Sequence, residues 1–301
     1  MSFLFAFIAI LFLFLLSAAF VIFILGPLIL LQPHRRGKEW YATFTDHLEP
    51  RSEGVPQEDL WLTTPDGVRL SCWLVKRKHA RGTVVYLHGV GDCKISGVDL
   101  ATFLYGQEYN VFLYDSRHHG ESGGKYCTYG FFERHDVSTV LDYIQQRTDL
   151  NVGNIGVFGT SMGAAVAIQA AAIDARIAAV VAEASFTTLR SIAVDYQRRL
   201  IKLPWHFLRN VAFARSQKVA GFKARFVAPI EDVKKLQCPI LFIHGVEDTF
   251  VDVEHSKELY RVAREPKELL LINGANHNNV WEIGGNKYKN ALTAFFDSNL
   301  K

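Results

Sequence analysis

The segment Gly159-Thr160-Ser161-Met162-Gly163 has the spacing that is typical of a nucleophilic serine. It follows an apolar run, 155–158, predicted to be a strand, and it opens an alanine-rich stretch, 162–173, predicted to be a helix. In this context the serine lies on a strained turn, and the flanking glycines let strand and helix pass closely. The helix N-terminus would also favour negative charge developing nearby. An ordinary glycine-rich turn is the alternative, but the context favours Ser161 as a nucleophile.

A serine hydroxyl is a poor nucleophile at neutral pH, so it needs a base, and the base needs an orienting carboxylate. We predict that Asp248 is the acid and that His277 is the base. Asp248 follows a predicted strand at 240–243, and His277 follows another at 268–272. Because the carboxyl ends of parallel strands meet at one edge of a sheet, both side chains are expected near Ser161.

Other residues compete for these roles less well. Glu247 and Asp252 remain alternatives for the acid because they lie in the same loop as Asp248. Asp115 also follows a predicted strand, but with Arg117 it is expected to organise its own loop. The remaining histidines near predicted strand ends or helices are His88, His118, His119, His244 and His255, and none lies in the loop expected to hold the base.

A tetrahedral intermediate needs two hydrogen-bond donors for its oxyanion. The first is expected to be the backbone N–H of Met162, directly after the nucleophile. The second is expected from the loop His88-Gly89-Val90-Gly91, which follows the predicted strand 83–87, and Val90 N–H is the candidate. A tight strand-to-helix loop with a structural histidine is the alternative interpretation.

The elements that must position these residues alternate between strand and helix. Predicted strands are 60–63, 68–76, 83–87, 110–114, 155–158, 177–181, 239–243 and 268–272, and predicted helices are 131–147, 162–173, 253–264 and 287–299. Short apolar strands that alternate with helices predict an α/β fold, with a mostly parallel sheet covered on both faces. Residues 186–230 interrupt the alternation.

Residues 57–300 resemble the α/β-hydrolase superfamily. The matching residues are His88-Gly89, Asp115, Arg117, Gly120, Ser122, the Ser161 motif, His244-Gly245, Asp248 and His277. The resemblance looks closest to the serine aminopeptidase S33-like and lysophospholipase-like branch, which includes membrane-anchored Bem46-like or ABHD-type members. It implies that Ser161 is the nucleophile, Asp248 the acid and His277 the base. It also implies a helical cap at about 186–230.

The expected activity is cleavage of carboxylic esters through an acyl-Ser161 intermediate, which a water activated by His277 then hydrolyses. Acyl lipids, lysophospholipids and acyl-thioesters are the candidate substrates. A peptidase that removes N-terminal residues is a second hypothesis, although the sequence identifies no anionic group to hold the substrate amine. A non-catalytic binding protein on the same fold is a third. No metal or organic cofactor is expected, because the three side chains supply nucleophile and proton transfer themselves.

The first 31 residues differ in kind from the rest. They contain no charged side chain, and 27 of them are hydrophobic. Residues 3–31 are long enough to cross the hydrocarbon core of a membrane as a helix. We therefore predict an anchor at 1–31, a connector at 32–56 and a hydrolase domain at 57–301. A signal peptide is the alternative, because Ser17-Ala18-Ala19 resembles a cleavage site, but no Lys or Arg precedes the apolar run.

Charges around this segment predict its orientation. No Lys or Arg precedes it, whereas His34, Arg35, Arg36 and Lys38 follow it. Positive residues favour the cytoplasmic side of a membrane. The cysteines, which lack CxxC spacing, fit a reduced compartment and no metal site. A single-pass membrane protein with a cytoplasmic catalytic domain is therefore expected.

The predicted cap is strongly basic. Residues 186–226 carry nine Lys and Arg against Asp195 alone, whereas the whole chain has a net charge of only +3. A basic stretch with interspersed aromatic residues beside an anchor is typical of a membrane interface, where each nearby cation adds about 1 kcal/mol of attraction to anionic headgroups. A solvated helix face that only covers the active site is an equal alternative. No nucleic-acid binding is expected, because no recognised module accompanies the charge.

Overall fold

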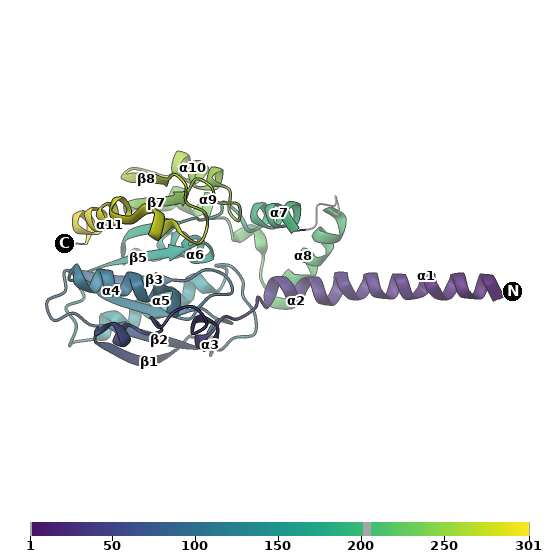
Figure 1. Ribbon diagram of the computed structural model, residues 1–301, viewed down its shortest axis with the longest axis horizontal. Coiled ribbons are helices and arrows are strands. Elements are labelled where there is room, and N and C mark those ends of the chain that lie inside the picture. The colour runs from purple at the N-terminus through teal and green to yellow at the C-terminus, as the bar shows by residue number, and fades with distance from the viewer. Residues whose placement is uncertain (1, 201–205, 301) are drawn as a thin grey trace.

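An eight-stranded sheet forms the centre of the molecule in the computed structural model, which describes residues 2–200 and 206–300. The strand order is β1-β2-β4-β3-β5-β6-β7-β8 (Figure 1). The strands are β1 (Gln57–Thr63), β2 (Arg69–Val75), β3 (Gly82–Leu87), β4 (Asn110–Tyr114), β5 (Asn154–Thr160), β6 (Ile177–Glu183), β7 (Ile240–Gly245) and β8 (Lys267–Ile272). β2 pairs antiparallel with β1 and β4, and every other pairing in the sheet is parallel. The predicted α/β fold is confirmed.

Helices cover both faces of this sheet, so its parallel strands appear in the sequence as continuous apolar runs. β3 and β4, for example, are buried along their whole length. One face packs against α4 (Val98–Gly106) and α11 (Val280–Asn299). The other packs mainly against α5 (Glu133–Gln146), α6 (Met162–Ala171) and α10 (Val253–Val262).

Two helices differ from the sequence-based expectation. α4 was not predicted, because its nine residues form a short apolar run in which periodicity cannot separate helix from strand. α11 begins at Val280 rather than at residue 287. Gly285 breaks its regular conformation with φ of 47°, so the start of α11 is a separate helical piece before the main helix.

The interval between β6 and β7 holds two larger helices, α7 (Leu189–Leu200) and α8 (His206–Ala220), and the short α9 (Pro229–Asp232). They occupy the region in which the cap was expected. Residues 201–205, which include Lys202 of the predicted basic set, lie outside the described residues. At the base of this region, Phe186, Leu189 and Phe222 pack in a third apolar cluster with Leu31 of the N-terminal helix.

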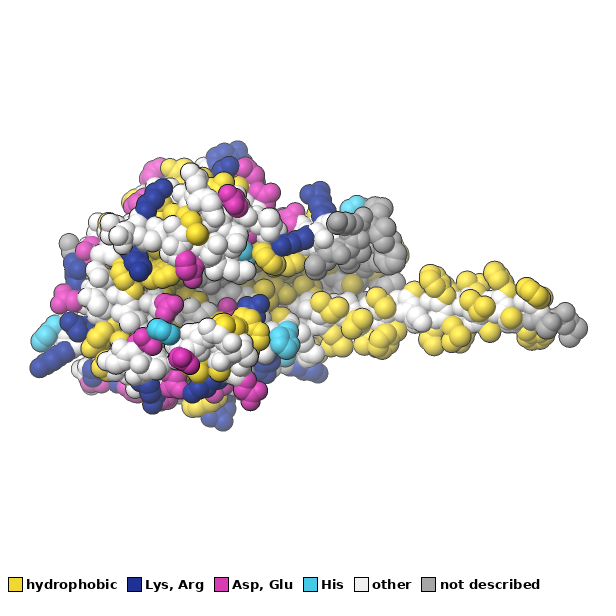
Figure 2. All heavy atoms as spheres, viewed as in Figure 1, with side chains coloured by type: hydrophobic (Ala, Val, Ile, Leu, Met, Phe, Trp, Pro, Cys, Tyr) yellow, Lys and Arg dark blue, Asp and Glu magenta, His cyan; other side chains and the backbone are white. Residues whose placement is uncertain are grey.

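The N-terminal segment is a long helix that projects from the body as an apolar rod (Figures 1 and 2). It comprises α1 (Ser2–Phe20), a π-helical turn η1 (Val21–Leu25) and α2 (Gly26–Leu31). Residues 3–31 are long and apolar enough to cross a membrane, and a signal sequence has the same properties. The last turn belongs to the body, because Leu31 is fully buried and its carbonyl accepts the N–H of Cys127 at 2.8 Å.

Residues 32–56 pack against the loops that follow β3 and β4. This connector contains α3 (Lys38–Tyr41) and a 3-10 turn, η2 (Pro50–Glu53). The Arg35 guanidinium donates to the carbonyl oxygens of Gly120 at 2.7 Å and Ser122 at 2.6 Å. The connector therefore helps to fix the edge of the sheet at which the candidate residues lie.

Candidate active site

Ser161 lies on a tight turn between β5 and α6, with φ of 53° and ψ of −113°. A non-glycine residue with positive φ is strained, as expected for a nucleophile on a strand-to-helix turn. A Cβ atom at Gly159 would lie 2.3 Å from the carbonyl oxygen of Gly163, and one at Gly163 would lie 2.0 Å from that of Leu87. Both flanking positions therefore require glycine for the turn to form.

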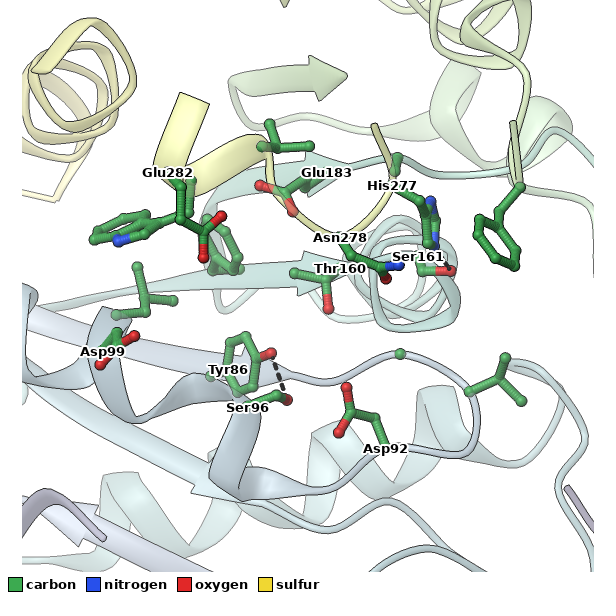
Figure 3. Close-up of a pocket in the computed structure, with 18 of the residues that line it drawn as sticks. Tyr86, Asp92, Ser96, Asp99, Thr160, Ser161, Glu183, His277, Asn278 and Glu282 are labelled. Carbon is green, nitrogen blue, oxygen red and sulfur yellow. Dashed lines mark hydrogen bonds between the residues drawn. The ribbon is translucent and has the colours of Figure 1, made fainter. Parts of the chain in front are cut away.

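The structure brings Ser161, Asp248 and His277 together. His277 Nε2 lies 3.1 Å from Ser161 Oγ, and His277 Nδ1 lies 2.6 Å from Asp248 Oδ2. Because the carboxylate can only accept, Nδ1 carries the proton and Nε2 is free to accept one from the hydroxyl. Figure 3 shows the imidazole pointing at Ser161 from the loop that follows β8. This is the arrangement that a serine nucleophile requires.

Asp248 is buried and remains a carboxylate. Its Oδ1 accepts the backbone N–H groups of Phe250 at 2.7 Å and Val251 at 2.9 Å. Burial opposes ionisation, but the hydrogen bonds from His244, His277 and Val251 outweigh it and hold the pKa of Asp248 well below its usual range. The negative charge that orients His277 is therefore permanent at neutral pH.

His244 also contacts the Asp248 carboxylate, and the sequence analysis did not predict this contact. Its Nε2 lies 2.9 Å from the carbonyl oxygen of Val251 and 3.3 Å from Asp248 Oδ2. Both oxygens accept, so Nε2 carries the proton, and Nδ1 accepts from Ser256 Oγ at 2.6 Å. The ring is fully buried, so it acts within the protein rather than on a substrate. The available signals were the family resemblance of His244-Gly245 and the position of His244 four residues before Asp248.

The two alternative acids have other surroundings. Asp252 caps α10, where its Oδ1 accepts the N–H of Glu254 at 2.9 Å. Glu247 is exposed to solvent. Neither has a hydrogen bond with His277 in the described residues, whereas Asp248 does. The geometry therefore favours Asp248 as the orienting carboxylate.

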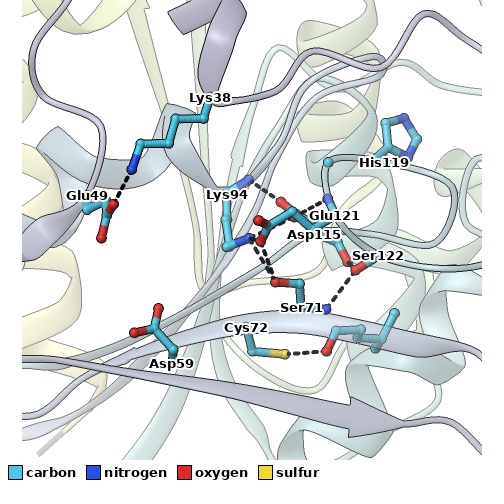
Figure 4. A network of polar contacts seen from close by, with 12 residues as sticks. Lys38, Glu49, Asp59, Ser71, Cys72, Lys94, Asp115, His119, Glu121 and Ser122 are labelled. Atoms are coloured by element: carbon cyan, nitrogen blue, oxygen red, sulfur yellow. Dashed lines mark hydrogen bonds and ion pairs between the residues drawn. The ribbon is translucent and has the colours of Figure 1, made fainter. Parts of the chain in front are cut away.

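Asp115 is held by a buried lysine rather than by a histidine (Figure 4). Lys94 Nζ lies 2.8 Å from Asp115 Oδ2 and 2.7 Å from Glu121 Oε2, and its backbone N–H donates to Asp115 Oδ1 at 2.7 Å. Burial lowers the pKa of Lys94, but the two carboxylates outweigh it and raise the pKa overall. This network ties the loop after β3 to the loop after β4. Asp115 thus organises its loop, and Lys94 is the partner that the sequence did not reveal.

The loop after β3 passes directly beside the nucleophile. A Cβ atom at Gly89 would lie 3.5 Å from the Cβ atom of Ser161. His88, at the start of this loop, is fully buried: its Nδ1 donates to the carbonyl of Gly89 at 2.8 Å and its Nε2 accepts the N–H of Ser116 at 2.9 Å. The ring is therefore structural. Val90 and Ser161 line the same cavity, and Met162 begins α6.

That cavity has a volume of about 320 Å³ and lies between the loop after β3 and the start of α11 (Figure 3). Its lining carboxylates are Asp92, Asp99, Glu183 and Glu282. Burial raises the pKa of Glu183, against a hydrogen bond that Tyr288 Oη donates to Glu183 Oε2 at 2.5 Å. A single carboxylate at the end of an apolar strand is not a motif, so Glu183 could not be singled out from the sequence.

Known proteins are similar to this chain in sequence and in architecture. A family model described as "Serine aminopeptidase, S33" matches residues 78–225. The uncharacterised protein YqkD of Bacillus subtilis is 29% identical over 219 residues, which are 72% of this chain and 71% of YqkD. The alpha/beta hydrolase domain-containing protein WAV2 of Arabidopsis thaliana is 28% identical over 249 residues, covering 80% of this chain and 79% of WAV2. The structure of the Pyrococcus furiosus esterase Pf2001 matches with a TM-score of 0.74 and 26% identity, over 90% of this chain and 99% of the esterase.

Proposed function

Because the chain belongs to the α/β-hydrolase superfamily, we propose that it is a serine hydrolase that cleaves carboxylic esters through an acyl-Ser161 intermediate. The observation that supports this proposal most strongly is the hydrogen-bonded series from Ser161 Oγ through His277 to Asp248, with contacts of 3.1 and 2.6 Å. The choice of esters is supported by the similarity to the P. furiosus esterase.

The proposed reaction has two halves. In the first, His277 Nε2 takes the hydroxyl proton as Ser161 Oγ attacks the ester carbonyl, and Asp248 stabilises the imidazolium that forms. The backbone N–H groups of Val90 and Met162 hold the oxyanion. His277 then gives its proton to the leaving alcohol oxygen, and the acyl-serine remains. In the second half, His277 deprotonates a water, the water attacks the acyl carbon, and the acid leaves as Ser161 regains its proton.

We also propose that residues 1–31 anchor the enzyme in a membrane, with the catalytic domain in the cytoplasm and with α7 and α8 facing the bilayer. Figure 1 shows both helices on the side of the body from which the N-terminal helix projects. α8 lies against that helix, because a Cβ atom at Gly26 would be 3.0 Å from the Cβ atom of Ala212. Phe207, Arg215 and Lys218 on α8 are exposed, which suits an interface with anionic lipid. Acyl lipids, lysophospholipids and acyl-thioesters are the proposed substrates.

The experiment compares ester hydrolysis by full-length protein and by the Ser161→Ala variant in detergent micelles. We expect p-nitrophenyl butyrate to be cleaved by the wild type and the rate to fall by at least about 10³-fold in the variant. Ser138→Ala, which removes a hydroxyl from α5 that bonds Asp174 instead, is the matched control and should keep its activity. Equal hydrolysis by wild type and Ser161→Ala would contradict the proposal. Faster cleavage of aminoacyl p-nitroanilides than of esters would favour the peptidase alternative.

A further inference from the structure

The cavity beside Ser161 carries an excess of negative charge that the proposed acyl transfer does not use. Its described lining includes four carboxylates, Asp92, Asp99, Glu183 and Glu282, but only one Lys or Arg, Arg36. The chain as a whole has a net charge of +3. The negative cavity is therefore a local feature and does not follow from the composition. A cleft lined by one sign of charge concentrates ligands of the opposite sign.

Of these four carboxylate residues, Glu183 is the one whose backbone is hydrogen-bonded to the nucleophile. It ends β6, and its carbonyl oxygen accepts the N–H of Ser161 at 2.8 Å. Its side chain faces the cavity (Figure 3) and receives a hydrogen bond from Tyr288. Lys94 neutralises Asp115 on the neighbouring loop, but no Lys or Arg among the described residues forms an ion pair with Glu183. Glu183 is half-buried, and the cationic group of a ligand would stabilise its carboxylate there.

Other walls of the cavity carry hydroxyl groups and aromatic rings, which suit a cation. Tyr86 Oη lies 2.9 Å from Ser96 Oγ, and the hydroxyl of Thr160 also faces the cavity (Figure 3). Tyr86 and Phe158 stack with their ring centres 6.0 Å apart and line the same space. Hydroxyl oxygens turn partial negative charge towards a cation, and aromatic faces attract ammonium ions, quaternary ones included.

We propose that this cavity is a subsite for an ammonium group of the substrate, with Glu183 as its counter-ion. The inference rests on the proposed function, because the ester that carries the ammonium group is the one that Ser161 attacks. The ammonium group belongs either to the alcohol or to the acyl part of the ester, since the cavity chemistry is the same for both. Glu183 is a specificity-determining residue in this proposal and takes no part in proton transfer.

Pairs of esters that differ only in one charge test the proposal. Butyrylcholine is compared with 3,3-dimethylbutyl butyrate for the alcohol side, and ethyl 4-(trimethylammonio)butyrate with ethyl 5,5-dimethylhexanoate for the acyl side. In each pair, carbon replaces the charged nitrogen without changing shape. The wild-type enzyme in micelles should prefer the charged ester in one pair by at least about tenfold in kcat/KM, and Glu183→Gln should reduce that ratio at least about tenfold.

Ratios within a pair separate specificity from general damage, because a substitution that only disturbs the fold lowers both rates by the same factor. Glu268→Gln removes an equal charge from an exposed position on β8 and should leave the ratio unchanged. Wild-type ratios near 1 in both pairs, or a ratio unaffected by Glu183→Gln, would overturn the proposal.

Choline binding to Ser161→Ala, measured by calorimetry, gives a second test that needs neither turnover nor a substitution at Glu183. Choline should bind at least about tenfold more tightly than 3,3-dimethylbutanol. Equal affinity, or no binding of choline, would contradict the ammonium subsite. If the wild type hydrolyses p-nitrophenyl butyrate but shows no charge preference, only the subsite proposal fails. If no ester is hydrolysed but choline binds selectively, the proposed hydrolase function fails instead.

Discussion

Asp248→Asn should abolish most of the activity while preserving the fold. The new Asn oxygen can still accept the N–H groups of Phe250 and Val251, now at 2.7 and 2.9 Å. Its NH2 group then faces His277 Nδ1, where a carboxylate oxygen accepts at 2.6 Å in the native site. Two opposed donors are avoided only if the proton of the imidazole moves to Nε2. That nitrogen then donates to Ser161 Oγ and cannot take its proton.

The expected loss follows from this tautomer change. Removing the orienting carboxylate of a serine–histidine–carboxylate site typically lowers kcat by about 10⁴, or about 5.5 kcal/mol of transition-state stabilisation. The assay is kcat for p-nitrophenyl butyrate in micelles, with thermal melting to show that the variant is folded.

Asp252→Asn is the matched control, because it removes the same charge from the same loop. Its carboxylate contacts the N–H of Glu254 and not the histidine, so kcat should change by less than about threefold. A loss of less than tenfold in Asp248→Asn would refute the role assigned to Asp248. A 10⁴-fold loss in Asp252→Asn or Glu247→Gln would transfer that role to another carboxylate.

Three further predictions concern packing, pH and the N-terminal helix. Gly163→Ala would place Cβ 2.0 Å from the carbonyl oxygen of Leu87 and should lower the free energy of unfolding by about 3 kcal/mol or more. Gly106→Ala is the control, because open space surrounds that position, and it should not destabilise the protein. Urea denaturation measures both variants. Burial lowers the pKa of His119 from its ordinary 6.5 to about 3, so the folded state binds this proton less readily than the unfolded state. The resulting stability is present above pH 6.5 and is lost as pH falls towards 3, and His119→Gln should show a shallower loss in urea midpoints over this range. Deleting residues 1–24 should release the protein from alkaline-washed membranes and leave it folded. Deleting residues 1–36 also removes the buried Leu31 and should lower the melting temperature. Equal melting temperatures for the two deletions would contradict this prediction.

The strands were predictable because buried parallel strands are continuous apolar runs bounded by turns. All eight predicted strands are present, with small differences at their ends. The helix boundaries were harder to predict from the sequence. α4 is too short for its periodicity to be read, and the Gly284-Gly285 pair hides the helical start of α11. These errors do not move any candidate residue, because the residues follow strands rather than helices.

The order and spacing of Ser161, Asp248 and His277 were visible in the sequence because each follows a strand directly. Their supporting residues were not visible, because their partners lie elsewhere in the chain. Lys94 reaches a carboxylate on the loop after another strand, and Glu183 is bonded to Tyr288 across 105 positions of sequence. Such contacts exist only once the sheet has formed, so the sequence alone does not indicate them.

Labelling with a fluorophosphonate probe tests the central claim most directly, because the probe forms a covalent adduct only with an activated serine. The intact wild-type protein in micelles at neutral pH should gain a single adduct, which peptide mass spectrometry should assign to Ser161. His277→Ala should react far more slowly, since it lacks the base that lies 3.1 Å from Ser161 Oγ. A well-folded wild-type protein that remains unlabelled, or that is labelled at another residue, would contradict the account.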